Sequence, residues 1–241
     1  MKGRKLVPMV ALYILIVGIF LGTAYLGSTV TSVVVQRLPV ERDHTIVIDA
    51  GHGGEDGGAI SGTGRPESTY NLEIALKVND LLHLLGYRTK MIRVRDESVY
   101  TTGHTIAEKK VSDLKQRVRM VNETDNAILV SIHQNMFSDS RYHGAQVFYG
   151  PEGESKDLAE QLQVALCQFL NPGSNRKIKK ADGIYLMQHI KCTGVLVECG
   201  FLSNPEEEAM LRTKEYQQKL SCVIAGTLSL FLTDEARADI I

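Results

Sequence analysis

Short apolar, β-branched segments that alternate with helical patterns constrain the fold of this chain more than any other feature. We expect strands at residues 44–50, 87–94, 126–133, 144–150, 183–187 and 194–200. We expect amphipathic helices at residues 67–86, 113–123 and 155–170, and one or two closing helices within residues 205–232. This alternation predicts a single α/β domain with a mostly parallel, twisted sheet of about six strands and with helices on both faces.

A long charge-free segment lies near the beginning of the chain. Residues 6–36 contain no charged side chain, and the basic residues Lys2, Arg4 and Lys5 precede them. A helix needs about 20 apolar residues to span a bilayer, and the basic residues beside such a helix stay in the cytoplasm. We therefore expect residues 1–37 to form a transmembrane anchor, with a cleaved signal peptide as the alternative.

Either form of that segment places the rest of the chain outside the cytoplasm, where it is membrane-anchored or, after cleavage, secreted. The polar residues 38–43 read as a linker. Residues 44–233 then form the folded domain, and residues 234–241 form a C-terminal tail.

The charge balance of the exported part argues against nucleic acid as a partner. Residues 1–37 hold four of the 27 lysines and arginines and none of the 28 acidic residues, which leaves the remainder with a net charge of −5. A nucleic-acid-binding domain shows a basic face instead.

The four cysteines do not have the spacing of a metal site. Cys167, Cys192, Cys199 and Cys222 include no C-x-x-C pair. An exported domain can hold a disulfide, and four cysteines allow three pairings, among which the sequence does not choose. We favour free, buried thiols.

Polar side chains follow three of the predicted strands at the point where each strand ends. His52 follows the first strand across Gly51, His133 ends the strand at 126–133, and Glu198 follows the apolar residues 194–197. Ligands of open α/β sheets bind outside the carboxyl ends of the strands, so parallel strands would place these side chains along one edge. An unpaired carboxylate in so apolar a segment as that of Glu198 is costly to bury and indicates a partner or a function.

Two histidines and a carboxylate at one edge suit a catalytic zinc ion, which uses three protein ligands and leaves one position for water. Glu67 begins the helix that leaves the glycine-rich loop, so this loop can fold Glu67 back beside His52. Glu198 then remains as the general base for hydrolysis of a carbonyl compound. The predicted site therefore holds one zinc ion per chain on His52, Glu67 and His133.

The motifs around these residues resemble the zinc-dependent N-acetylmuramoyl-L-alanine amidases. The matching segments occur in the family's order between about residues 45 and 232. They are IVIDAGHGGEDGGA at 46–59, the element from Glu67 to Leu72, Arg117 with Asn122, SIHQN at 131–135 and VLVECGFLSNPEE at 195–207. The resemblance implies that His52, Glu67 and His133 are the zinc ligands and that Glu198 is the catalytic carboxylate. Glu73 is the alternative to Glu67, but it falls in the body of the helix.

The resemblance also implies a substrate and a biological role. The family hydrolyses the amide bond between the lactyl group of muramic acid and L-alanine, so the partners are peptidoglycan glycan strands that carry stem peptides. The single membrane segment and the motif DGIYLMQ at 182–188 are most similar to the subgroup that acts in spore-cortex formation during sporulation. A partner protein is one way in which such an enzyme could be activated.

Two other functions stay open on the residues alone. One is a zinc peptidase or deacetylase that cuts another bond of the same polymer. The other is an inactive wall-binding scaffold, which the presence of all four active-site side chains disfavours.

Overall fold

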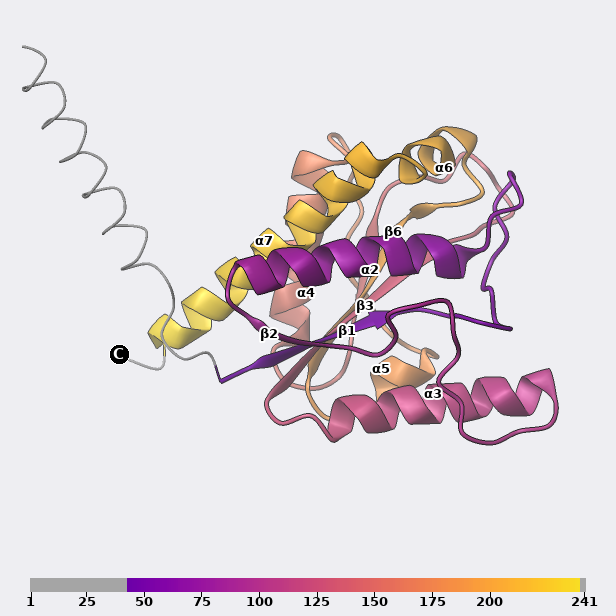
Figure 1. Cartoon of the computed structure of the whole chain (residues 1–241). Helices are drawn as coiled ribbons and strands as arrows, with labels where there is room; N and C mark the ends of the chain where they lie inside the picture. The colour runs from indigo at the N-terminus through magenta and orange to yellow at the C-terminus, as the bar shows by residue number, and fades with distance from the viewer. Residues whose placement is uncertain (1–42, 239–241) are drawn as a thin grey trace, which may run out of the picture. The chain divides into compact units, whose positions relative to one another are not determined.

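The computed structural model describes residues 43–238, which form one α/β domain (Figure 1). The strands are β1 (Thr45–Ala50), β2 (Arg88–Met91), β3 (Ala127–Asn135), β4 (Gln146–Tyr149), β5 (Lys179–Lys180) and β6 (Thr193–Phe201). The helices are α2 (Glu67–Leu84), α3 (Ile106–Asn122), α4 (Ser155–Phe169), α5 (Tyr185–His189), α6 (Pro205–Leu211) and α7 (Lys214–Ala238).

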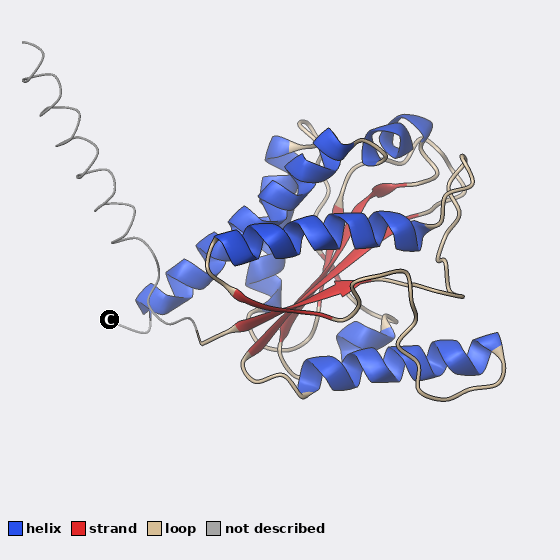
Figure 2. Ribbon diagram, in the orientation of Figure 1, coloured by secondary structure: helices blue, strands red, loops and turns tan. Residues whose placement is uncertain are grey.

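The six strands form one sheet in the order β2-β1-β3-β6-β4-β5. The first four strands of that order are parallel to their neighbours, and β4 pairs with β6 in the antiparallel direction. The predicted mostly parallel sheet is therefore confirmed, and β1, β3 and β6 lie side by side at its centre (Figure 2).

Helices cover both faces of this sheet (Figure 1). Strand residues such as Ile48 and Val130 pack with α2, α4 and α7 in one buried cluster. The residues between them, such as Val47 and Leu129, face a second cluster with α3 and α5. Strands that are buried on both faces need continuous apolar sequence, which is why the predictions for the central strands are confirmed.

Two predicted elements differ in the structure. Residues 183–187, predicted as a strand, belong largely to the short helix α5, where Leu186 and Met187 are buried. A five-residue apolar segment does not distinguish a buried strand from a buried helix by its periodicity. The sixth strand is instead β5, in the basic segment that follows α4.

The second helix also begins earlier than residue 113. Helix α3 starts at Ile106, because Thr105 accepts a hydrogen bond from the backbone N–H of Glu108 and the Glu108 carboxylate accepts one from the backbone of Thr105. This reciprocal pair is a capping box, which is a stronger start signal than Ser112. The added turns extend α3 along the edge where the polar residues gather.

The structure holds all four cysteines as free thiols, but the expectation that they are buried is correct for Cys199 alone of the four: Cys167 and Cys192 are partly buried and Cys222 is exposed. Among residues 43–238, no helix is both long enough and apolar enough to cross a bilayer. The predicted anchor at 1–37 lies outside the described residues, as does the predicted linker up to residue 42.

Candidate metal centre

The turn after β1 gives His52 an unusual backbone conformation. The φ angle of His52 is 59°, in the left-handed region that costs a residue with a side chain roughly 1 kcal/mol or more. Two contacts hold it there: the guanidinium of Arg117 donates to the His52 carbonyl at 2.8 Å, and the ring atom Nδ1 lies 2.9 Å from Oδ2 of Asp56. The opposite ring atom, Nε2, is left facing the centre of the site.

Strands β3 and β6 bring the next two residues together. They are parallel and in register, and His133 is paired with Glu198 across the ladder. Gly51, on the neighbouring strand end, allows the His133 ring to approach, because a Cβ atom at Gly51 would lie 2.1 Å from Nε2 of His133. The expectation that these side chains lie along one edge is confirmed, but His133 and Glu198 lie inside β3 and β6 rather than at their ends, because both strands continue to Asn135 and Phe201.

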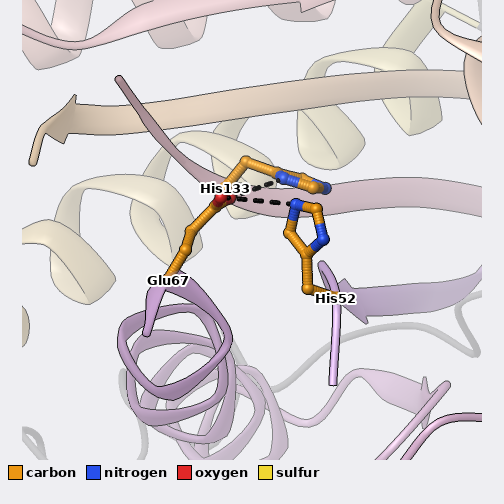
Figure 3. A group of neighbouring side chains, drawn as sticks. All are labelled: His52, Glu67 and His133. Atoms are coloured by element: carbon orange, nitrogen blue, oxygen red, sulfur yellow. Dashed lines mark hydrogen bonds and ion pairs between the residues drawn. The ribbon is translucent and has the colours of Figure 1, made fainter. Parts of the chain in front are cut away.

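Glu67 completes the group from the first residue of α2 (Figure 3). Its two carboxylate oxygens face different imidazoles: Oε1 lies 2.9 Å from Nδ1 of His133, and Oε2 lies 3.3 Å from Nε2 of His52. Backbone N–H groups of Ala59 and Gln134 also donate to this carboxylate. The loop therefore folds back beside His52 as expected.

One nitrogen from each histidine and one oxygen from Glu67 lie within 4.8 Å of one another. Glu67 is buried and the two histidines are partly buried, and the three side chains point toward one another (Figure 3). Two imidazoles and one carboxylate form a donor set that Zn²⁺ uses in catalytic sites with an open coordination position. The residues present therefore fit a zinc ion.

The electrostatics of the group favour an ionised Glu67. Burial on its own raises the pKa of this carboxyl group, but the hydrogen bond from His133 and the charges of both histidines outweigh burial and bring the pKa to about 2. The carboxylate is then available as a ligand over the whole physiological pH range.

Glu198 lies beside the group and has a different environment. It is partly buried, and within the described residues its buried Oε2 atom has no hydrogen-bond partner. Loss of contact with water is the main cause that raises its pKa to about 7, with a smaller increase from Glu67 and an opposing effect of His133. A carboxyl group with a pKa near neutrality is suited to accept and return a proton.

Two buried arginines hold the loop that carries His52. Arg117 donates to Asp49 and to the carbonyls of Ala50 and His52. Arg93 donates to the carbonyls of Ala50, Gly51 and Ser68, and so links the loop to the start of α2. The sequence alone did not predict this role for either arginine, although Arg117 is part of the resemblance.

Two other residues singled out in the sequence lie elsewhere. Glu73, the alternative to Glu67, pairs with Arg65 and accepts a hydrogen bond from Gln217. Asn122 donates to the carbonyl of His189 and accepts from the backbone of Lys191, and so ties α3 to the end of α5. Neither belongs to the group of potential ligands.

Comparisons with known proteins agree with this geometry. The family described as N-acetylmuramoyl-L-alanine amidase matches residues 46–229. The germination-specific N-acetylmuramoyl-L-alanine amidase of Bacillus subtilis (strain 168) is 38% identical over 189 residues, which are 77% of this chain and 79% of that protein.

Solved structures give the same result. The CwlD amidase from Clostridioides difficile, in complex with the GerS lipoprotein, superimposes with a TM-score of 0.75 and 36% identity, over 78% of this chain and 98% of that one. An N-acetylmuramoyl-L-alanine amidase from Clostridium difficile 630 has a TM-score of 0.69 and 27% identity, over 80% of this chain and 98% of that one.

Proposed function

The chain belongs to the N-acetylmuramoyl-L-alanine amidase family, and from this premise we propose that it works with one zinc ion on His52, Glu67 and His133 and with Glu198 as general base. The reaction is hydrolysis of the amide between the muramic acid lactyl group and L-alanine in peptidoglycan. The observation that supports the proposed roles is the convergence of three ligand atoms beside a carboxylate whose buried oxygen has no hydrogen-bond partner among residues 43–238.

Glu67 and Glu198 are assigned different roles because their surroundings differ. Glu67 faces both imidazoles with its two oxygens, which is the arrangement of a ligand. Glu198 is adjacent to His133 but keeps a free oxygen, which is the arrangement of a group that handles protons. When bound, zinc would polarise the scissile carbonyl and lower the pKa of a water molecule.

The proton transfers are assigned to Glu198. In its ionised form it takes a proton from the attacking water, and in its protonated form it returns that proton to the alanine nitrogen as the C–N bond breaks. The pKa of about 7 keeps both forms accessible near neutral pH. The products are a muramic acid with a free lactyl carboxylate and a stem peptide with a free amino terminus.

We further propose that the enzyme acts outside the cytoplasm in formation of the spore cortex. The charge-free residues 6–36 and the basic residues before them support a membrane anchor. The similarity to a germination-specific amidase supports the link to spores. The solved complex of a similar amidase with a lipoprotein supports an activating partner protein for this chain as well.

Product analysis tests this function. The full chain is incubated with purified peptidoglycan, and the soluble products are identified by mass spectrometry. We expect stem peptides that begin with alanine and glycan strands that keep their acetyl groups. Free acetate, or fragments cut within the peptide, would instead support the deacetylase or peptidase alternative.

The contact between Asp56 and His52 leads to a prediction on metal affinity. A carboxylate that accepts a hydrogen bond from the far nitrogen of a metal-bound histidine fixes the ring and its tautomer, and loss of such a group lowers metal affinity about 10- to 100-fold. We expect Asp56→Ala to weaken zinc binding by this factor in a competition titration against a chromophoric chelator.

Glu55→Ala is the matched control, because Glu55 is the exposed neighbour that pairs with Lys109 on the surface. It should bind zinc as the wild type does. Equal zinc affinity of Asp56→Ala and wild type would show that Asp56 does not orient His52.

A further inference from the structure

A cavity of about 210 Å³ lies beside the potential ligands. Glu198 and both histidines line it, together with a stripe of α3 formed by residues at helical spacing, namely Lys110, Asp113, Leu114 and Arg117. The facing wall is mainly apolar and consists of Ile184, Tyr185, Leu186 and Leu196. A substrate held at Glu198 must therefore lie between this apolar wall and α3.

Most of the charge on the α3 stripe is already neutralised inside the protein. Arg117 pairs with Asp49 and Asp113, and the side chains of Arg117 and Asp49 are 3% and 1% exposed. Lys110 differs, because its side chain is 51% exposed. Among the described residues that line the cavity, Lys110 is the one lysine or arginine whose side chain reaches solvent.

The present partner of Lys110 can be exchanged at little cost. Its ammonium group lies 3.3 Å from Oδ2 of Asp56, and an exposed pair of this kind is worth less than about 1 kcal/mol. Asp56 keeps other partners, because Oδ2 faces the ring of His52 and Oδ1 accepts from the backbone of Gly58. Lys110 is thus free to pair with an anionic group of a bound substrate.

We propose that Lys110 is a specificity-determining residue that binds the free carboxylate of the second stem-peptide residue, while the alanine side chain lies against the apolar wall. This inference rests on the proposed function. In peptidoglycan the alanine is followed by a D-glutamate linked through its γ-carboxyl group, and its α-carboxyl group is either free or amidated. Lys110 would distinguish these two forms by charge.

The test compares two substrates that differ only in that group. Disaccharide–tetrapeptide fragments with D-isoglutamate and with D-isoglutamine are prepared, and kcat/KM is measured for each with the full-length, zinc-loaded enzyme. A charge-assisted contact at a partly exposed site changes kcat/KM by a factor of about five or less. We expect wild type to prefer the acidic form about 3- to 5-fold.

Lys110→Met should have a lower kcat/KM on the acidic form and an unchanged kcat/KM on the amidated form, and should therefore lose the preference. Lys110→Arg should retain the preference for the acidic form. Lys115→Met is the matched control, because Lys115 is exposed on the same helix and does not line the cavity; its preference should equal that of wild type. Circular dichroism confirms that each variant is folded.

Three outcomes would overturn the proposal. Wild type could hydrolyse both forms equally, or Lys110→Met could keep the wild-type preference. Lys110→Met could also lower kcat/KM equally on both forms. Lys110 would then act through its contact with Asp56, which pairs with His52, and not by binding the substrate carboxylate. Failure of wild type to hydrolyse either form would be a distinct result, because it would overturn the proposed function and this inference with it.

Discussion

Replacement of Glu198 with glutamine is expected to lower kcat for release of stem peptides by about 10²- to 10⁴-fold. Glutamine has nearly the same shape as glutamate but cannot accept the proton of the attacking water. In the described part of the chain, the Glu198 side chain forms no hydrogen bond with the side chains of His52, Glu67 or His133, so Glu198→Gln should keep its zinc. Activity and zinc content are measured on the same preparation, by product chromatography and by mass spectrometry of the metal.

The stability of this variant separates a catalytic role from a structural one. The Oε2 atom of Glu198 has no hydrogen-bond partner in the described structure, and burial outweighs the favourable charge of His133, so the folded state disfavours the ionised carboxyl group. We expect Glu198→Gln to be at least as stable as wild type in urea. A variant that retains zinc and wild-type kcat would eliminate Glu198 as the general base.

Replacement of Arg117 with methionine is expected to reduce the free energy of unfolding by about 3–5 kcal/mol. The substitution leaves the buried Asp49 carboxylate without its cationic partner, and removal of one partner of a buried ion pair costs this much. It also removes the donor to the carbonyl of His52, which holds the left-handed turn. The variant should therefore lose zinc affinity as well as stability, as measured by urea unfolding and zinc titration.

Arg119→Met is the matched control on the same helix. Its side chain is 58% exposed, and its contact with Glu123 is a long 3.9 Å, so the change in stability should be within about 0.5 kcal/mol. The double variant Asp49→Asn/Arg117→Met removes both charges and should recover part of the loss. An Arg117→Met protein as stable as Arg119→Met would contradict the assigned role of the buried pair.

The ion pair between Asp49 and Arg117 also makes the stability of the folded state depend on pH. Burial opposes ionisation of Asp49. The charges of Arg117 and His133, together with the hydrogen bonds from Ser131 and Arg117, outweigh burial and lower the pKa of Asp49 below the ordinary value of 3.8. A carboxyl group with a depressed pKa in the folded state contributes stability that is complete above its unfolded pKa and is lost as the pH falls through the folded pKa. This contribution is therefore present at neutral pH and declines only below about pH 4.

Much of the fold could be predicted from the sequence, because the central strands are buried on both faces. The continuous apolar residues of β1, β3 and β6 have few other stable arrangements, and helices α2, α4 and α7 show clear amphipathic spacing. The errors fall on short or weakly patterned elements. Helix α5 is five residues long and β5 is two, and contacts made by the folded chain decide their conformation.

The candidate site was predictable to the extent that its residues follow strands. His52 follows β1, His133 and Glu198 lie in the carboxyl-terminal halves of β3 and β6, and Glu67 comes at the start of a helix, so the topology brings them together. The supporting residues carry no such local signal. Arg93 contacts carbonyls more than 40 positions earlier in the chain, and its role depends on the path of the loop.

The zinc content of the full chain, measured together with the release of stem peptides from purified peptidoglycan, tests the central claim most directly. We expect about one zinc ion per chain in the active wild type. His133→Ala should lose the metal and the activity together. If wild type releases peptides at full rate after all metal has been removed, or if His133→Ala keeps both zinc and activity, the three residues His52, Glu67 and His133 are not the metal centre of this amidase.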